Sequence, residues 1–217
     1  MDGYGWVLIV ITTVVCGMAF WLLCRDREDW EEKRENREHV WYGLGMSLLA
    51  AGIGVMMCTV YRENDFLFSL KRLCLIAIIW PTAYVDYRTY RIPNSFIGAG
   101  LTMRLLIFMA ELLRCGNQAW YILFPELIAS GAVFLAMMLC NLAVKNAIGY
   151  GDMKLFILMG LMLGSEGIWG AVLMSLIIEF IMAAFLLLTK KKGKKDVIPF
   201  GPAIVAGTYI SVFLTGM

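Results

Sequence analysis

Two aspartates, Asp86 and Asp152, each stand where a long apolar run meets a short polar turn. Two carboxylates held about 3 Å apart cannot both be ionised, so such a pair shares a proton and titrates as a unit. The ionised member acts as a general base on a bound water, while the protonated member polarises a carbonyl and later protonates the leaving amine. These two residues could therefore hydrolyse a peptide bond without a covalent intermediate.

Asp86 ends an apolar run and is followed by a basic turn and then by Pro93-Asn94. Proline in the first turn, with asparagine beside it, favours the start of a new helix. A simpler interpretation stays open, in which Asp86 is a solvated loop acid paired with Arg88 or Arg91.

Asp152 follows two glycines, Gly149 and Gly151, and precedes Lys154. Glycine permits positive φ and carries no side chain, so another backbone can approach the turn closely. The simpler alternative is an ordinary acid in the first turn of a helix, where it faces the helix dipole favourably.

A third polar segment is Pro199-Phe200-Gly201-Pro202, which opens the last apolar run. Two prolines and a glycine at a membrane boundary are typical of an unwound stretch that lines a cavity. A plain helix start after a basic loop accounts for the same pattern.

No other set of residues competes for catalysis or for a metal ion. His39 is the single histidine, there is no Gly-x-Ser-x-Gly sequence, and no cluster has the ligand spacing of a zinc site. The six cysteines lie in or at the ends of apolar runs, which predicts buried apolar residues rather than disulfides. We expect neither a metal nor a cofactor.

The elements that position these residues are membrane helices. Of 217 residues, 60% are hydrophobic and 17% are charged, with a mean hydropathy of +0.73. A soluble domain averages about 45–50% apolar and 25% charged residues, so a soluble fold is excluded. The net charge of +2 does not indicate a nucleic-acid partner. We predict an all-α polytopic membrane protein, a single domain over 1–217.

About eight runs approach the ~20 residues that cross a bilayer. The sixth run is short, and the third carries Lys71 and Arg72 near its start and Pro81 near its end, which predicts a kink or a later start. The predicted spans are 5–24, 40–61, 66–85, 95–113, 120–144, 153–164, 168–189 and 198–215.

The distribution of Lys and Arg predicts the orientation. With the N-terminus outside, the loops at 25–39, 86–94, 145–154 and 190–196 face the cytoplasm and hold fourteen of the nineteen basic residues. Both termini then lie outside, and Asp86 and Asp152 lie at the cytoplasmic side. The charged loop 25–39 is predicted to be a solvated helical extension, and the basic loop 190–196 to lie on anionic lipid.

Arg104 and Glu179 stand near the middle of two spans. A charge at that depth is costly unless it is paired. We therefore predict that these two residues form an ion pair with a structural role.

Three segments together resemble the signatures of the type IV prepilin peptidases, which are GxGD-type intramembrane aspartyl proteases. The Gly-x-Gly-Asp element is shared with presenilins and signal peptide peptidases, whereas the spacing from Asp86 to Pro93-Asn94 is more specific to the prepilin branch. The resemblance covers roughly residue 73 to the C-terminus. The matching segments are Asp86…Ile92-Pro93-Asn94, Gly149-Tyr150-Gly151-Asp152-x-Lys154-Leu155 and Pro199-Phe200-Gly201-Pro202.

The resemblance implies a membrane endopeptidase of the prokaryotic cell membrane that removes the leader from prepilins or pseudopilins at the cytoplasmic face. It implies catalytic roles for Asp86 and Asp152 and positioning of Asp152 by Gly149 and Gly151. Further substrate-binding or supporting positions implied are Lys154, Pro93, Asn94, Pro199, Gly201 and Pro202. Membrane lipids are expected partners, nucleic acid is not, and the pilus assembly machinery stays open as a further partner.

Larger members of the resembled family also N-methylate the new N-terminus and carry paired Cys-x-x-Cys motifs after the first span. Loop 25–39 has no cysteine and no glycine, so methyltransferase activity is not expected. The chain resembles the compact peptidase-only members of Tad/Flp pilus systems.

Two alternatives remain beside this interpretation. A presenilin-like protease would cleave other transmembrane helices and use the same aspartates. A proton-coupled transporter or a membrane scaffold would need no peptidase chemistry, but a transporter predicts inverted repeats and carboxylates at mid-membrane rather than at its edge.

Overall fold

The computed structural model describes residues 45, 48, 51–56, 59, 65–144, 148–190 and 198–215. The predictions for span 5–24, most of span 40–61, loop 25–39, loop residues 191–196 and three of the cysteines concern residues outside this set. The chain divides into two compact units, Met1–Pro81 and Thr82–Met217. All described elements are helical, which confirms the all-α prediction for this part of the chain.

The first unit contains helical residues 51–56 and the first part of α3 (Phe66–Thr89). Asp65 caps α3, because its Oδ2 accepts the backbone N–H of Leu67 at 3.1 Å. The helix begins at Phe66, where the third span was predicted to begin, so the alternative of a later start is wrong. Arg72 of α3 is buried. Its guanidinium lies 3.4 Å from the ring centroid of Phe68, one turn earlier in the helix, and donates to the Phe68 carbonyl at 3.3 Å.

In the second unit, α3 ends one turn after Asp86 and the chain reverses into α4 (Asn94–Cys115). The Tyr90 N–H donates to the Asp86 carbonyl at 2.8 Å, with Tyr90 in the left-handed region at φ 53°. Pro93 occupies the N-cap position of α4 with φ −66° and ψ 132°. The predicted helix start at Pro93-Asn94 is confirmed.

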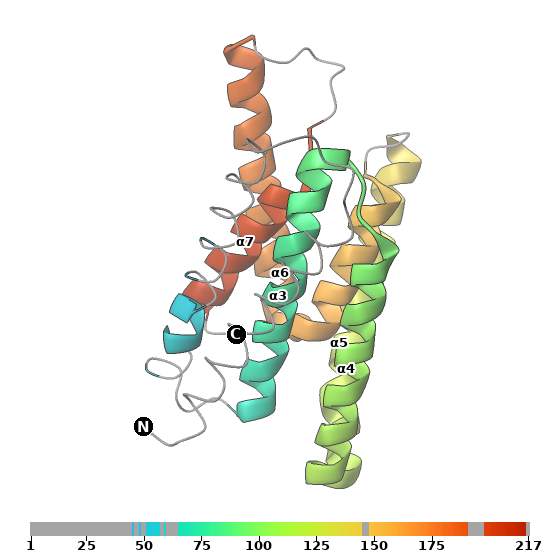
Figure 1. The fold of residues 1–217 in the computed structure, drawn as a ribbon. Coiled ribbons are helices and arrows are strands. Elements are labelled where there is room, and N and C mark those ends of the chain that lie inside the picture. The colour runs from blue at the N-terminus through green and yellow to red at the C-terminus, as the bar shows by residue number, and fades with distance from the viewer. Residues whose placement is uncertain are drawn as a thin grey trace. The chain divides into compact units, whose positions relative to one another are not determined.

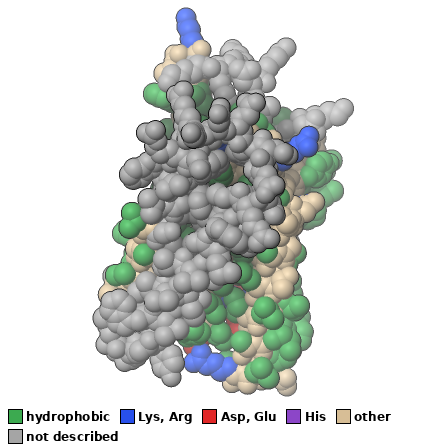
Figure 2. Space-filling model, viewed as in Figure 1, with side chains coloured by type: hydrophobic (Ala, Val, Ile, Leu, Met, Phe, Trp, Pro, Cys, Tyr) green, Lys and Arg blue, Asp and Glu red, His purple; other side chains and the backbone are tan. Residues whose placement is uncertain are grey.

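The helices α4 and α5 (Ala119–Ala143) are joined by the short 3₁₀ turn η1 (Gly116–Gln118). Gly116 has φ 56°, a conformation that glycine adopts without strain, and its N–H donates to the Leu112 carbonyl. Figure 2 shows hydrophobic side chains gathered over these two helices. The exposed apolar residues there include Leu105, Leu106, Leu113, Tyr121, Phe124 and Ile128.

Helix α6 (Tyr150–Leu188) consists of two segments, 150–163 and 165–188, because Gly164 breaks it with φ 74° and ψ −175°. This break coincides with the end of the predicted sixth span. The first segment packs antiparallel to α5, where a Cβ on Gly160 would lie only 2.9 Å from the Ser130 Cα. Glycine therefore allows the two backbones to touch.

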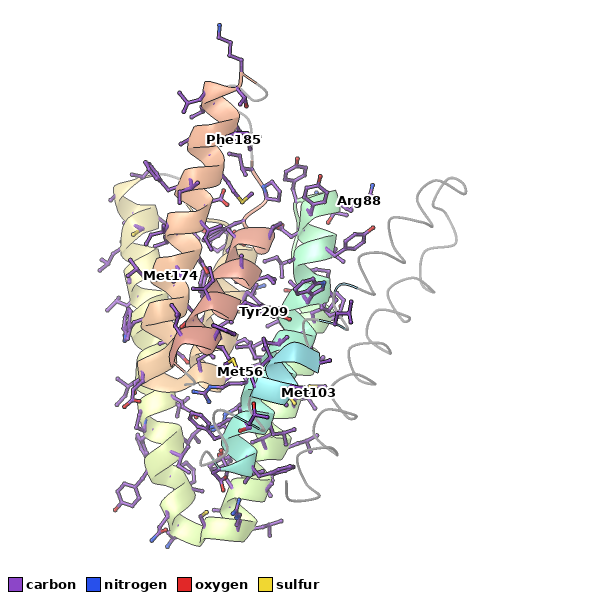
Figure 3. The ribbon with its side chains drawn as sticks, turned by 90° about the vertical axis from the view of Figure 1, so that its left-hand side faces the viewer. Met56, Arg88, Met103, Met174, Phe185 and Tyr209 are labelled. Atoms are coloured by element: carbon purple, nitrogen blue, oxygen red, sulfur yellow. The ribbon has the colours of Figure 1, made fainter. Side chains whose placement is uncertain are left out.

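The last helix, α7 (Gly201–Thr215), packs antiparallel to the second segment of α6. Figures 1 and 3 show the two helices side by side, and Figure 3 labels Met174 on α6 and Tyr209 on α7. A Cβ on Gly207 would lie 2.4 Å from the backbone N of Ser175, and one on Gly170 would lie 2.8 Å from the Ser211 Oγ. Small residues on both helices thus set their separation.

Three helical stretches among the described residues are long and apolar enough to cross a membrane: Phe66–Thr89, Asn94–Ala143 and Tyr150–Leu188. The middle stretch comprises α4 and α5, which have 22 and 25 residues. These stretches agree with a membrane protein, while the number of eight spans stays a prediction. Cys74, Cys115 and Cys140 are free, but Cys115 and Cys140 are exposed, so the prediction that they are buried was wrong.

The contact between α6 and α7 yields a stability prediction. Gly207→Ala forces a methyl group against the Ser175 backbone, so we expect it to lower the free energy of unfolding by about 1–3 kcal/mol. The matched control is Gly98→Ala on α4, whose added Cβ meets nothing within 4 Å and gains helix propensity of up to ~1 kcal/mol. Thermal unfolding of the detergent-solubilised protein measures both, and equal midpoints would contradict the proposed contact.

Candidate active site

The three polar segments singled out in the sequence meet at one end of the helices of the second unit. Asp86 lies near the end of α3, Asp152 lies in the first turn of α6, and Gly201 begins α7. Arg88, labelled in Figure 3, marks the same end of α3. Helix ends from distant parts of the sequence thus supply one site.

Asp86 is buried, and its Oδ2 accepts the backbone N–H of Gly201 at 2.8 Å. A carboxylate close to the C-terminal end of its own helix faces the negative end of that helix dipole. The N-terminus of α7 offsets this, because its free N–H groups point toward an anion. The interpretation of Asp86 as a solvated loop acid paired with an arginine is therefore wrong.

Gly201 has to be glycine for this contact to form. A Cβ at this position would lie 2.9 Å from the Ala83 Cα and 3.0 Å from both the Cβ and the Oδ2 of Asp86. The flanking residues support the approach: Pro199 is buried, and the Phe200 ring lies 5.7 Å from the Phe156 ring of α6, centroid to centroid.

Pro202 is the second residue of α7, a position where a helix has no partner for an N–H group. The segment therefore combines a helix start with a close approach to Asp86. The sequence left open whether segment 199–202 is an unwound stretch or a plain helix start. The structure shows a helix start, and this helix start also contributes to the candidate site.

Asp152 is half-buried in the first turn of α6, and its carboxylate lies beside Gly149, whose backbone N–H interacts favourably with it. Gly149 is the N-cap of α6, and a Cβ there would lie 2.9 Å from Oδ2 of Asp152. Asp152 also lies within electrostatic range of Asp86 and, more weakly, of Glu179. The two aspartates predicted to act together thus lie within electrostatic range of each other, and each lies against a glycine.

Two contacts join the segment after Asp86 to the segment around Asp152. A Cβ on Gly151 would lie 3.1 Å from the Ile92 Cβ, so the absence of a side chain lets these segments touch. The Lys154 Nζ donates to the Asn94 Oδ1 at 3.0 Å. The candidate residues therefore form one connected group.

The prediction that Arg104 pairs with Glu179 was wrong. The Arg104 guanidinium forms ion pairs with Glu126 of α5 and, at 3.2 Å, with Glu111 of its own helix. All three residues are at least 96% buried. Both partners could have been found from the sequence. Glu111 stands seven residues after Arg104, on the same helix face, and Glu126 is an acid within an apolar run.

Arg104 also supports the segment of α6 that carries Asp152. Its Nε donates to the Leu161 carbonyl at 3.0 Å. That carbonyl lies in the last turn before the break at Gly164, where a helix leaves acceptors without intrahelical donors. Arg104 therefore caps the C-terminal end of segment 150–163.

Asn141, near the end of α5, is a contributor that the sequence analysis missed. Its Nδ2 donates to the Ile148 carbonyl at 3.0 Å and its Oδ1 accepts the Ile148 N–H at 2.7 Å. The available signal was an amide in an otherwise apolar run. Among the residues that the structure describes, no three His, Cys, Asp or Glu side chains are grouped so as to hold a metal ion.

Comparison with known proteins places the chain beside a family of peptidases. Residues 73–188 match the model of the type IV leader peptidase family. The prepilin leader peptidase/N-methyltransferase of Bacillus subtilis (strain 168) is 28% identical over 141 residues, which are 63% of this chain and 52% of that protein. The chain therefore spans about half the length of this relative. No solved structure matches.

The buried charge cluster formed by Arg104, Glu111 and Glu126 yields a second stability prediction. Arg104→Met leaves Glu111 and Glu126 buried without their cation, so we expect a loss of about 3–5 kcal/mol in the free energy of unfolding. Arg114→Met, at an exposed arginine of the same helix, is the matched control. Thermal unfolding measures both variants, and equal losses for Arg104→Met and Arg114→Met would contradict the role of the cluster.

Proposed function

Because the chain belongs to the type IV leader peptidase family, we propose that it is a membrane aspartic endopeptidase that removes the leader peptide from type IV prepilin-like precursors. The observation that carries the proposal is that Asp86 and Asp152, from two different helices, lie within electrostatic range of each other. The Asp86 carboxylate accepts the backbone N–H of Gly201, and the Asp152 carboxylate lies against Gly149.

In the proposed mechanism the pair shares one proton. The ionised carboxylate takes a proton from a bound water, which attacks the carbonyl carbon of the scissile peptide bond. The protonated carboxyl polarises the carbonyl oxygen and then gives its proton to the leaving amine. Because separate glycines hold the two carboxylates, we infer a resting pair that comes together when substrate binds.

We propose that the site faces the cytoplasm of a prokaryotic cell, with both chain termini outside. The candidate residues all lie at the helix ends next to loops 86–94, 145–154 and 190–196, which are rich in Lys and Arg. This is the positive-inside pattern. The location at helix ends also favours a peptidase over a transporter, whose ion-coupled carboxylates lie near mid-membrane.

The substrate class follows from the relative, whose name is that of a prepilin leader peptidase. That relative is also named as an N-methyltransferase. We propose that this chain acts as a peptidase only, since loop 25–39 contains neither cysteine nor glycine. Prepilin-like precursors and membrane lipids are then its partners, and the pilus assembly machinery is a candidate partner.

The first test of the proposal is leader removal from a candidate prepilin of the same genome, measured in membranes. Asp86→Asn and Asp152→Asn should each lower the cleavage rate by about 10²–10⁴-fold, since general acid–base catalysis contributes this much. The matched control is Asp65→Asn, at an exposed acid that caps α3, because asparagine caps a helix equally well.

Loss of cleavage in both site variants, with unchanged amounts of protein, supports the aspartic mechanism. Cleavage that survives both substitutions refutes it. Cleavage of other membrane helices, without leader removal at a glycine preceding the hydrophobic segment, would favour a presenilin-like protease.

The glycine contacts give a further prediction for the same assay. Gly201→Ala places a methyl group against the Ala83 backbone and so displaces the N–H that holds Asp86, while Gly149→Ala pushes the Asp152 carboxylate away. A displacement of about 1 Å costs up to ~10²-fold in rate, and we expect losses of that order. Gly98→Ala, in open space, should cleave at the wild-type rate. Full activity of both site variants would show that these contacts are not needed.

A further inference from the structure

The side chain of Asn141 forms a two-bond clamp on the backbone of Ile148. One bond runs from the Asn141 Nδ2 to the Ile148 carbonyl, and the other from the Ile148 N–H to the Asn141 Oδ1. Only one orientation of the amide satisfies both, because Ile148 presents a donor and an acceptor in fixed places. The Asn141 Nδ2 also donates to the Met153 Sδ, at an N–S distance of 3.5 Å.

The clamp contacts the chain on both sides of Asp152. Ile148 directly precedes Gly149, which lies against the Asp152 carboxylate and whose carbonyl accepts the Met153 N–H at 3.1 Å. Met153 is the next residue after Asp152, and its side chain is buried. A chain of contacts therefore leads from Asn141 through Ile148 and Gly149 to the carboxylate.

The end of α5 does not account for this arrangement. The Val144 N–H donates to the Cys140 carbonyl at 2.8 Å, so the backbone itself closes the last turn of the helix. Asparagine is also a poorer helix former than leucine, and an amide is costly in an apolar membrane helix. The side chain of Asn141 thus acts on the start of α6 rather than on its own helix.

Gly149 cannot anchor this turn by itself. It has no side chain to pack, and as the N-cap of α6 it stands outside the helix with φ −66° and ψ 144°. The direction of its N–H depends on the peptide plane that joins it to Ile148, and the Asn141 clamp fixes the carbonyl of that plane.

We propose that Asn141 is a positioning residue for Asp152. Its amide fixes the Ile148 backbone, so that Gly149 keeps its place and the direction of its N–H beside the Asp152 carboxylate. The consequence for catalysis rests on the proposed peptidase function, whereas the consequence for the glycine turn does not.

The experiment compares Asn141→Leu, which removes both bonds, with Asn141→Asp, which keeps the acceptor for the Ile148 N–H. The matched control is Asn117→Leu, at an exposed asparagine of η1. We expect Asn141→Leu to lower kcat for leader removal by about 10–10²-fold, with KM changed far less, because misplacement of a reacting group acts on the chemical step. Asn141→Asp should be intermediate, and the control should match the wild type.

Two further readouts separate positioning from a merely structural role. Hydrogen–deuterium exchange of the amides of 149–153 should be faster in Asn141→Leu, while the thermal midpoint should stay within a few degrees of the wild type. Wild-type kcat in Asn141→Leu overturns the proposal, as does a loss of activity that only parallels loss of folded protein in both variants. If the wild type removes no leader, the peptidase function fails, and the exchange rates alone decide: unchanged exchange at 149–153 overturns the role of Asn141, and faster exchange supports it.

Discussion

The hydrogen bond from the Gly201 N–H to Asp86 is the contact on which the rest of the site depends. It joins the end of α3 to the start of α7 across 115 residues of sequence. It also places a buried carboxylate at the positive end of a helix dipole, which offsets the unfavourable end of its own helix. Only a glycine allows this approach, because any side chain at position 201 would collide with α3.

The second aspartate is supported in a different way, through the short helical segment that carries it. Segment 150–163 is attached at its start by the Asn141 clamp on Ile148 and at its end by the Arg104 bond to the Leu161 carbonyl. A helix that breaks inside an apolar environment leaves carbonyl groups that need donors from its neighbours. Arg104 supplies such a donor, and two glutamates compensate its own charge.

These supports suit the proposed chemistry. A pair of carboxylates that shares a proton acts only over short distances, so small shifts of either helix end change the rate strongly. The contacts between Gly151 and Ile92 and between Lys154 and Asn94 connect the two aspartate-bearing segments directly. In the proposed mechanism, substrate binding would draw the carboxylates together without moving whole helices.

The sequence by itself determined the helical class, the break after span 153–164 and the candidate residues, because hydrophobic runs, glycines and prolines act locally along the chain. It also singled out Asp86 and Asp152 as a pair, since no other residues offered comparable chemistry. Which groups neutralise Arg104 and which amide holds the turn before Asp152 were decided by the tertiary structure alone. An apolar helix shows from its sequence that a buried charge needs a partner, but packing angles and the break at Gly164 decide which neighbouring side chain reaches it. For the same reason Glu179, which the sequence favoured, lies outside the cluster, while Glu111 and Glu126 form it.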